Sequence, residues 1–98
     1  MKHFVIGTNR TTPEQDAQFL KILRERWSRL GWWHQVGETW LVIDATDTLT
    51  VTDLRDAAMV AFPGIYLMVL QVLPLNWSGF GPNDTMFPWM REWWERKP

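Results

Sequence analysis

The sequence contains no cysteine and only two serines, Ser28 and Ser78. The lack of thiols excludes disulfide bonds, a cysteine nucleophile and a thiolate metal site. Neither serine lies in a Gly-x-Ser-x-Gly motif, and the Gly79-Phe80-Gly81 stretch lacks the third glycine of a dinucleotide-binding loop. The sequence therefore carries no recognisable motif for nucleophilic catalysis or for a phosphate-binding loop.

Long apolar runs and a large net charge are also missing. The longest apolar stretch, residues 65–73, is interrupted by Gln71 and is far shorter than the ~20 residues of a membrane-spanning helix. The first ten residues hold only a three-residue apolar run, which is too short for the core of a signal peptide. Ten basic and eleven acidic residues give a net charge of -1, so the whole protein has no electrostatic attraction to nucleic acid or membrane. We expect a cytoplasmic protein with no membrane partner.

The chain of 98 residues is shorter than the ~150 residues typical of one domain. A chain of this size buries only about 60–65% of its unfolded surface, which makes oligomerisation a natural route to stability. Its charges are unevenly distributed: residues 1–31 carry six basic and three acidic side chains, whereas residues 32–85 carry one basic and six acidic. This separation is compatible with two surfaces of opposite sign or with ordinary solvated helix faces.

Two helices are predicted from their capping signatures. Thr12 can cap the first helix, Pro13 suits its first position, and Gln15 completes a capping box. Gly31 is expected to end this helix. A second helix is predicted after a similar cap at Thr50.

The predicted strands lie at residues 3–8, 32–36, 39–43 and 65–73. With the two helices they give the order βαββαβ, which is that of the ferredoxin-like α+β fold with an antiparallel sheet. We expect residues 1–74 to form this domain. Residues 75–98 are expected to add a loop and an amphipathic, Trp-rich C-terminal helix that packs on the domain or on a dimer partner.

A ferredoxin-like sheet carries both helices on one face, so its strands should alternate apolar and polar residues. The predicted strands are instead apolar on both sides, as in Phe4-Val5-Ile6 and Trp40-Leu41-Val42-Ile43. We therefore expect the second face to be covered by the C-terminal helix, by a second protomer, or by both.

Acidic and histidine side chains provide few candidates for chemistry. Asp44 and Asp47 follow the third predicted strand, and Asp84 lies in the later loop. Clustered carboxylates can hold the divalent metals of a nuclease, but acidic residues also serve in ordinary turns and caps. His3 and His34 lack Cys or His companions at metal-ligand spacing. We expect no cofactor and no metal, except that the nuclease alternative would require Mg²⁺ or Mn²⁺.

Eight tryptophans are the main compositional outlier. Consecutive Trp32 and Trp33 must point to opposite faces of a strand, whereas Trp27 lies on the apolar face of the first predicted helix. The tail tryptophans are open to three interpretations: cover for the sheet, contact with a partner, or stacking on bases. The aromatic residues that we place at an interface are Trp33, Trp40, Tyr66, Trp89, Trp93 and Trp94.

A nucleic-acid-binding surface is a further alternative. Such a surface would combine the basic side chains of Arg10, Lys21, Arg24 and Arg29 with Trp77 as a stacking residue. The acidic middle of the chain argues against this interpretation.

The stretches Trp32-Trp33-His34 and Thr39-Trp40-Leu41-Val42 resemble the hairpin of a known family. This family comprises small proteins akin to the CRISPR-associated nuclease subunit of the spacer-acquisition complex, and the chain looks most like its SinR-like branch. The matching stretches are residues 1–9, 30–42, 49–56 and 65–73, so the resemblance covers about residues 1–73.

The resemblance implies a ferredoxin-like fold and, from the nuclease members of the family, a symmetric dimer. Those members bind their metal with an aspartate at the end of the first strand, and the corresponding residue here is Asn9. A neutral amide lacks the charge that holds a divalent cation, so the resemblance predicts a scaffolding role without nuclease activity. If nuclease activity persisted, its residues would be Asn9, Asp44 and Asp47.

Our leading hypothesis is a non-catalytic, dimeric ferredoxin-like scaffold that binds a protein partner. A phage or mobile-element origin, with a role in regulating or blocking a host system, fits a small neutral module of this kind. The alternatives are a divergent metal-dependent nuclease and a nucleic-acid-binding protein.

Overall fold

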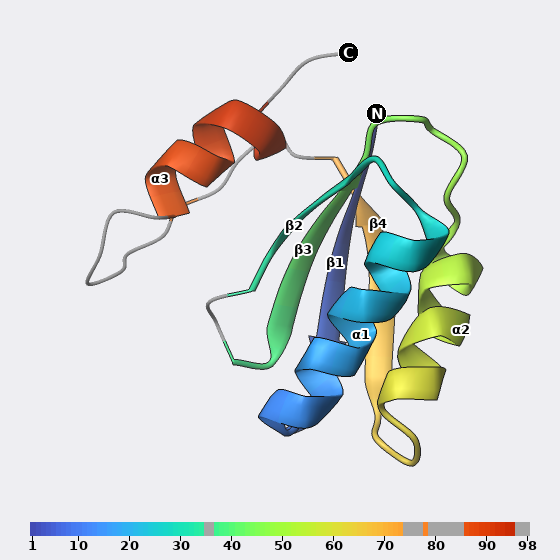
Figure 1. Ribbon diagram of the computed structural model, residues 1–98. Helices are drawn as coiled ribbons and strands as arrows, with labels where there is room; N and C mark the ends of the chain where they lie inside the picture. Colours follow the sequence, from blue (N-terminus) through green and yellow to red (C-terminus); the bar gives the residue numbers. More distant parts are fainter. Residues whose placement is uncertain (35–36, 74–77, 79–85, 96–98) are drawn as a thin grey trace.

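The computed structural model describes residues 1–34, 37–73, 78 and 86–95. Its strands are β1 (Lys2–Thr8), β2 (Leu30–Trp33), β3 (Thr39–Asp44) and β4 (Leu67–Val72). Its helices are α1 (Pro13–Arg26), α2 (Val51–Ala61), α3 (Met86–Trp89) and the π-helix η1 (Met90–Trp94). All strand pairs are antiparallel, in the order β2-β3-β1-β4 (Figure 1). The predicted α+β class with an antiparallel sheet is confirmed.

Both long helices begin where their capping signatures predict. The hydroxyl of Thr12 accepts a hydrogen bond from the Gln15 amide at 3.1 Å, and the Gln15 side chain accepts one from the Thr12 amide at 2.9 Å. Thr50 and Asp53 form the same reciprocal pair, at 3.1 and 2.9 Å, before α2. Each box satisfies two amides that a helix N-terminus leaves without partners.

The predicted end of the first helix is wrong. Helix α1 ends at Arg26, and Trp27 is its C-cap with an extended backbone. Gly31 lies instead in β2, opposite Ile43 of β3. Strand β2 therefore begins two residues before the predicted position. Pairing with β3 places Leu30 and Gly31 in the strand, although the local sequence pattern favours a helix there.

The first face of the sheet carries α1 and α2, as Figure 1 shows. Alternate residues of the two central strands point into this layer, where Phe19 meets the Trp40 ring edge-on at a centroid distance of 5.1 Å. The buried residues of the cluster are Phe4, Ile6, Phe19, Ile22, Leu23, Trp40, Val42, Leu49, Leu54, Ala57, Ala58, Ala61 and Phe62. This layer is the main hydrophobic core.

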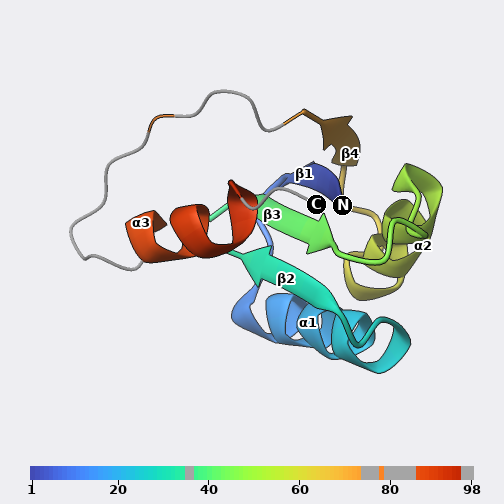
Figure 2. The same cartoon turned by 90° about the horizontal axis from the view of Figure 1, so that it is seen from above.

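The second face of the sheet is partly covered by the C-terminal helices. Figure 2 shows α3 on the side of the sheet opposite α1 and α2. Met90 and Trp94 are buried there against Ile43. A Cβ on Gly31 would come within 3.0 Å of the Trp93 ring, so the glycine permits a close approach of this helix to β2. The described part of the tail thus packs on its own sheet.

The two adjacent tryptophans of β2 separate as expected for a strand. Trp32 packs against the core under α1, whereas Trp33 lies beside Trp89 with their ring centroids 6.5 Å apart. The prediction that they point to opposite faces is confirmed.

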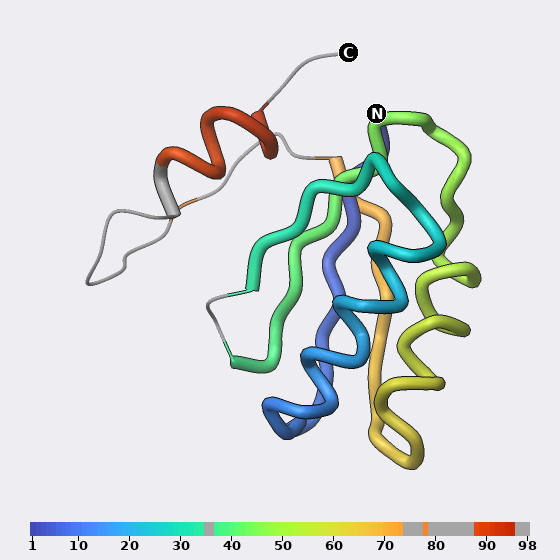
Figure 3. Tube along the Cα trace, viewed as in Figure 1, coloured from blue at the N-terminus to red at the C-terminus, as the bar shows by residue number. Residues whose placement is uncertain are grey.

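The chain begins next to the segment that joins β3 to α2 (Figure 3). Here the amino group of Met1 forms an ion pair with Asp47, and the Lys2 ammonium donates a hydrogen bond to the Leu49 carbonyl at 3.0 Å. These contacts join the start of β1 to the β3–α2 loop.

We expect Trp94→Ala to lower the free energy of unfolding by about 3–5 kcal/mol, as for other truncations of buried aromatic residues. The loss should appear in urea unfolding curves of the purified protein. Arg91→Ala, at an exposed position of the same helix, should change the unfolding free energy by less than about 0.5 kcal/mol. Equal stability of the two variants would contradict the packing of the tail on the sheet.

Candidate functional site

Asp44 is one of the carboxylates of the nuclease alternative, and the structure places it at the buried end of β3. Its Oδ1 atom accepts hydrogen bonds from the Thr46 amide and hydroxyl, at 2.9 and 2.6 Å. Its Oδ2 atom accepts from the amides of Thr48 and Leu49, at 2.9 and 2.7 Å. Since each oxygen already has two donors, Asp44 organises the turn that leads to α2.

The same contacts determine the charge of Asp44. Burial alone would raise the pKa of this carboxyl, but the hydrogen bonds from Thr46 and from the amides of Leu49, Thr46 and Thr48 outweigh it. The pKa therefore lies below its ordinary value of 3.8. The group is ionised at neutral pH and stabilises the loop as a carboxylate.

The three residues of the nuclease alternative do not meet within one chain. Asp44 pairs with Lys2 at the start of β1, whereas Asn9 follows Thr8 at the other end of that strand. At about 3.3 Å per residue, the strand separates them by roughly 20 Å. Asp47 lies beyond the Asp44 turn and pairs with the Met1 amino group. In the part of the chain that the structure describes, no group of three or more His, Cys, Asp or Glu side chains could hold a metal ion.

His34 joins the β2–β3 hairpin to the start of α1. Its ring stacks on Trp40, with centroids 3.8 Å apart and planes at 5°. Its Nδ1 atom donates to the Thr39 carbonyl at 2.8 Å, and its Nε2 atom lies 3.4 Å from Asp16 Oδ2. The other oxygen of Asp16 accepts from the Thr11 hydroxyl at 2.6 Å. Both ring nitrogens of His34 therefore face acceptor groups of the chain itself.

His3 joins the sheet to the C-terminal helices. Its Nε2 atom donates to the Trp94 carbonyl at 2.8 Å, and the two rings meet edge-on with centroids 4.9 Å apart. Burial lowers the pKa of His3 and outweighs the opposing effect of this hydrogen bond, while the charge of the amino terminus lowers the pKa further. This histidine is therefore a neutral structural group at pH 7.

The predicted nucleic-acid-binding residues do not form one cluster. Arg10 precedes α1 and Arg29 follows it, so the 14 residues of the helix, about 21 Å at 1.5 Å per residue, lie between them. On α1 itself, the Arg24 guanidinium lies 5.9 Å from the centroid of the Trp32 ring, and Lys21 pairs with Glu25 at 4.0 Å. Trp77, the predicted stacking residue, lies outside the described residues.

Most of the aromatic residues predicted to lie at an interface pack against other residues of the same chain. Trp40 is buried in the main core, and Trp33 and Trp94 are buried on the second face. Trp89 and Trp93 are half-buried against the same face. Only Tyr66 among the six is fully available to a partner, with 84% of its surface exposed.

Exposed apolar side chains instead gather along β4. We define the β4 surface as Tyr66, Met68, Leu70 and Leu73, which are 84%, 63%, 50% and 81% exposed. Met68 and Leu70 lie opposite Gly7 and Val5 of β1, on the face that carries the tail. Met68, Leu70 and Leu73 were missed as candidate site residues, although the uninterrupted apolar pattern of residues 65–70 already signalled a strand with two apolar faces.

In the part of the chain that the structure describes, the outer edge of β4 has no neighbouring strand. Within the described residues β4 pairs with β1 alone, so no strand lies along its other side. Natural edge strands usually carry a lysine, a proline or a bulge that prevents pairing with another chain. Residues 65–73 contain no charged residue and no proline. The β4 surface and this edge together form the best candidate for an interaction site.

We expect Asp44→Asn to lower the free energy of unfolding by about 2–3 kcal/mol at pH 7, because three amides and one hydroxyl of the turn lose a charged acceptor. The folded pKa of Asp44 is lowered, so its contribution is complete above about pH 4 and is lost as the pH falls through the folded pKa. The difference from wild type, measured by urea unfolding, should therefore be smaller at pH 3 than at pH 7. Asp56→Asn, an exposed control on α2, should be nearly neutral, and a pH-independent deficit in Asp44→Asn would contradict the ionised role.

Among the described residues, no helix has the length and the apolar character needed to cross a membrane. No protein-family model matches the chain, and no curated protein or solved structure matches it either.

Proposed function

We propose that this chain is a non-catalytic, ferredoxin-like scaffold that forms a homodimer through β4 and works by binding a protein partner. The observation that carries the proposal is the open, uncharged edge of β4 with its exposed apolar side chains. The sheet order β2-β3-β1-β4, with one helix after β1 and another after β3, supports the ferredoxin-like assignment.

A second copy of the chain suits the β4 edge for geometric reasons. Two identical edge strands can pair antiparallel about a two-fold axis, and this pairing satisfies the backbone groups along both edges. The pairing would extend each four-stranded sheet into one sheet of both copies, with Met68 and Leu70 of each copy on faces that the pleat leaves exposed. Side chains on the same face of the paired strands would contact each other across the pair, and these contacts remove part of their apolar surface from water.

The resemblance of residues 1–73 to the SinR-like branch supports the same interpretation, because a dimeric scaffold is what that resemblance implies. We place the chain in that family as part of this proposal. On this basis the dimer would regulate or block a host system by binding one of its proteins, as expected for a module carried by a phage or mobile element.

The nuclease alternative is less favoured on geometric grounds. The four hydrogen bonds to Asp44 occupy both of its oxygens, and Asn9 lies at the far end of β1. Binding of a metal at Asp44 would require the turn to Leu49 to break. The nucleic-acid alternative is less favoured because its basic residues are spread over both ends of α1.

For the dimer, we expect Met68→Glu to weaken self-association by roughly 100-fold or more, since like charges would replace apolar side chains on the two strands that pair. Sedimentation velocity over a range of protein concentrations measures this change. Met59→Glu is the matched control, because Met59 is similarly exposed, at 56%, but lies on α2. A wild-type protein that remains monomeric at about 100 µM, far above the micromolar dissociation constants of ordinary association, would overturn the dimer.

For catalysis, we expect labelled single- and double-stranded RNA and DNA to stay intact after incubation with the purified protein, with or without Mg²⁺ or Mn²⁺. Denaturing gels measure cleavage. Metal-dependent cleavage that is lost in Asp47→Ala would establish the nuclease alternative instead.

A further inference from the structure

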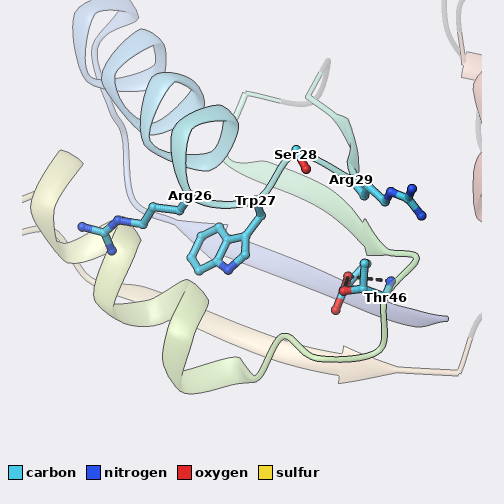
Figure 4. Close-up of a pocket in the computed structure, with 6 residues that line it drawn as sticks. Arg26, Trp27, Ser28, Arg29 and Thr46 are labelled. Carbon is cyan, nitrogen blue, oxygen red and sulfur yellow. Dashed lines mark hydrogen bonds between the residues drawn. The ribbon is translucent and has the colours of Figure 1, made fainter.

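A cavity lies at the end of α1, beside the start of β2. Strands β2 and β4 are the two opposite edges of the sheet, so the cavity is far from the β4 edge. Its lining comes from two segments: the turn after α1, with Arg26, Trp27, Ser28 and Arg29, and the end of β3, with Asp44 and Thr46 (Figure 4). The volume of about 320 Å³ is at the lower end of the range for small-molecule sites. The cavity shares no residue with the β4 surface.

The lining offers hydrogen-bond donors without partners. Among the residues that the structure describes, Arg26 and Arg29 form no ion pair, and the Ser28 hydroxyl and the Trp27 indole N–H form no hydrogen bond. The acceptors, by contrast, are already used. Both oxygens of Asp44 are filled, and the Thr46 hydroxyl donates to Asp44. The ligand that complements such a lining is rich in acceptors and negatively charged.

The balance of charge also favours an anion, by a modest margin. The two guanidinium groups supply two positive charges. The Asp44 carboxylate opposes them with one negative charge, and the C-terminus of α1 adds about half a negative charge. The net charge of the lining is therefore positive. Both arginines are exposed, so the site suits reversible binding of a small anion.

The arrangement of the lining side chains places a second requirement on the ligand, in addition to its negative charge. Figure 4 shows the Trp27 ring between the two arginines, with Arg26 directed to one side and Arg29 to the other. The indole is half-buried and packs against the main core, so its ring is held in place. A fixed aromatic ring provides a stacking surface for a planar group, and a guanidinium fork matches the oxygens of a phosphate.

We propose that this cavity binds a phosphate monoester carried by a planar aromatic group, of which a nucleoside monophosphate is the simplest representative. Trp27 contacts the planar group, while Arg29 and the Ser28 hydroxyl bind the phosphate oxygens. Asp44 acts only by holding Thr46 in position at the far wall of the cavity.

The test is an NMR titration of the ¹⁵N-labelled full chain that follows the indole N–H resonance of Trp27, assigned with the Trp27→Phe variant. The probes are adenosine monophosphate, adenosine and inorganic phosphate. We expect a saturable shift with adenosine monophosphate, a weaker response to phosphate, and none with adenosine. An equal response to adenosine, or no response at Trp27 to any probe, would overturn the proposal.

Charge-neutralising variants distinguish specific binding at the cavity from nonspecific electrostatic attraction of the anion to the protein. Arg29→Gln should weaken binding of adenosine monophosphate by roughly tenfold or more, as expected for loss of a charge-assisted hydrogen bond. Arg24→Gln is the matched control, since Arg24 is exposed on α1 but lies over Trp32, outside the cavity lining. Equal weakening by both variants, or a Trp27 response only to longer single-stranded nucleic acid, would overturn the proposal.

Discussion

A β-sheet that is apolar on both faces must be covered on both faces, and this requirement explains why helices pack on each side of the sheet. Helices α1 and α2 cover the first face and form the main core with it. The tail supplies a second cover, in which Met90 and Trp94 are buried against Ile43 of the central strand β3. This cover does not reach Met68 and Leu70 of β4, which remain exposed. The apolar surface left over at one edge of the sheet is what makes self-association the most economical interpretation.

The polar residues that could have carried chemistry are instead part of the framework. Asp44 uses both of its oxygens to hold the turn before α2. His34 has an acceptor at each ring nitrogen, and His3 is a buried donor to the Trp94 carbonyl. A general base needs a lone pair that a substrate can reach, and a metal site needs ligands that are not already committed. Function is therefore more reasonably sought at surfaces than at these side chains.

Among the described residues, the β4 surface and the cavity at the end of α1 lie at different edges of the sheet. Strand β4 is one edge of the order β2-β3-β1-β4, and the cavity at the end of α1 lies beside the start of β2, the other edge. A dimer formed through β4 would consequently leave the cavity open in both copies. Binding of a small anion and binding of a protein could then proceed independently, since no lining residue is shared between them.

Features that depend on near neighbours along the chain could be predicted from the amino-acid sequence. The capping boxes at Thr12 and Thr50 close over three residues, and the alternation of Trp32 and Trp33 follows from the period of a strand. Tertiary structure alone decided that α1 ends at Arg26, that Gly31 serves as a strand residue below the Trp93 ring, and that β4 keeps an open edge. It also decided the distance between Asn9 and Asp44, because their separation depends on the register of β1 against β3. Such features arise from contacts between segments distant in sequence, which no local pattern encodes.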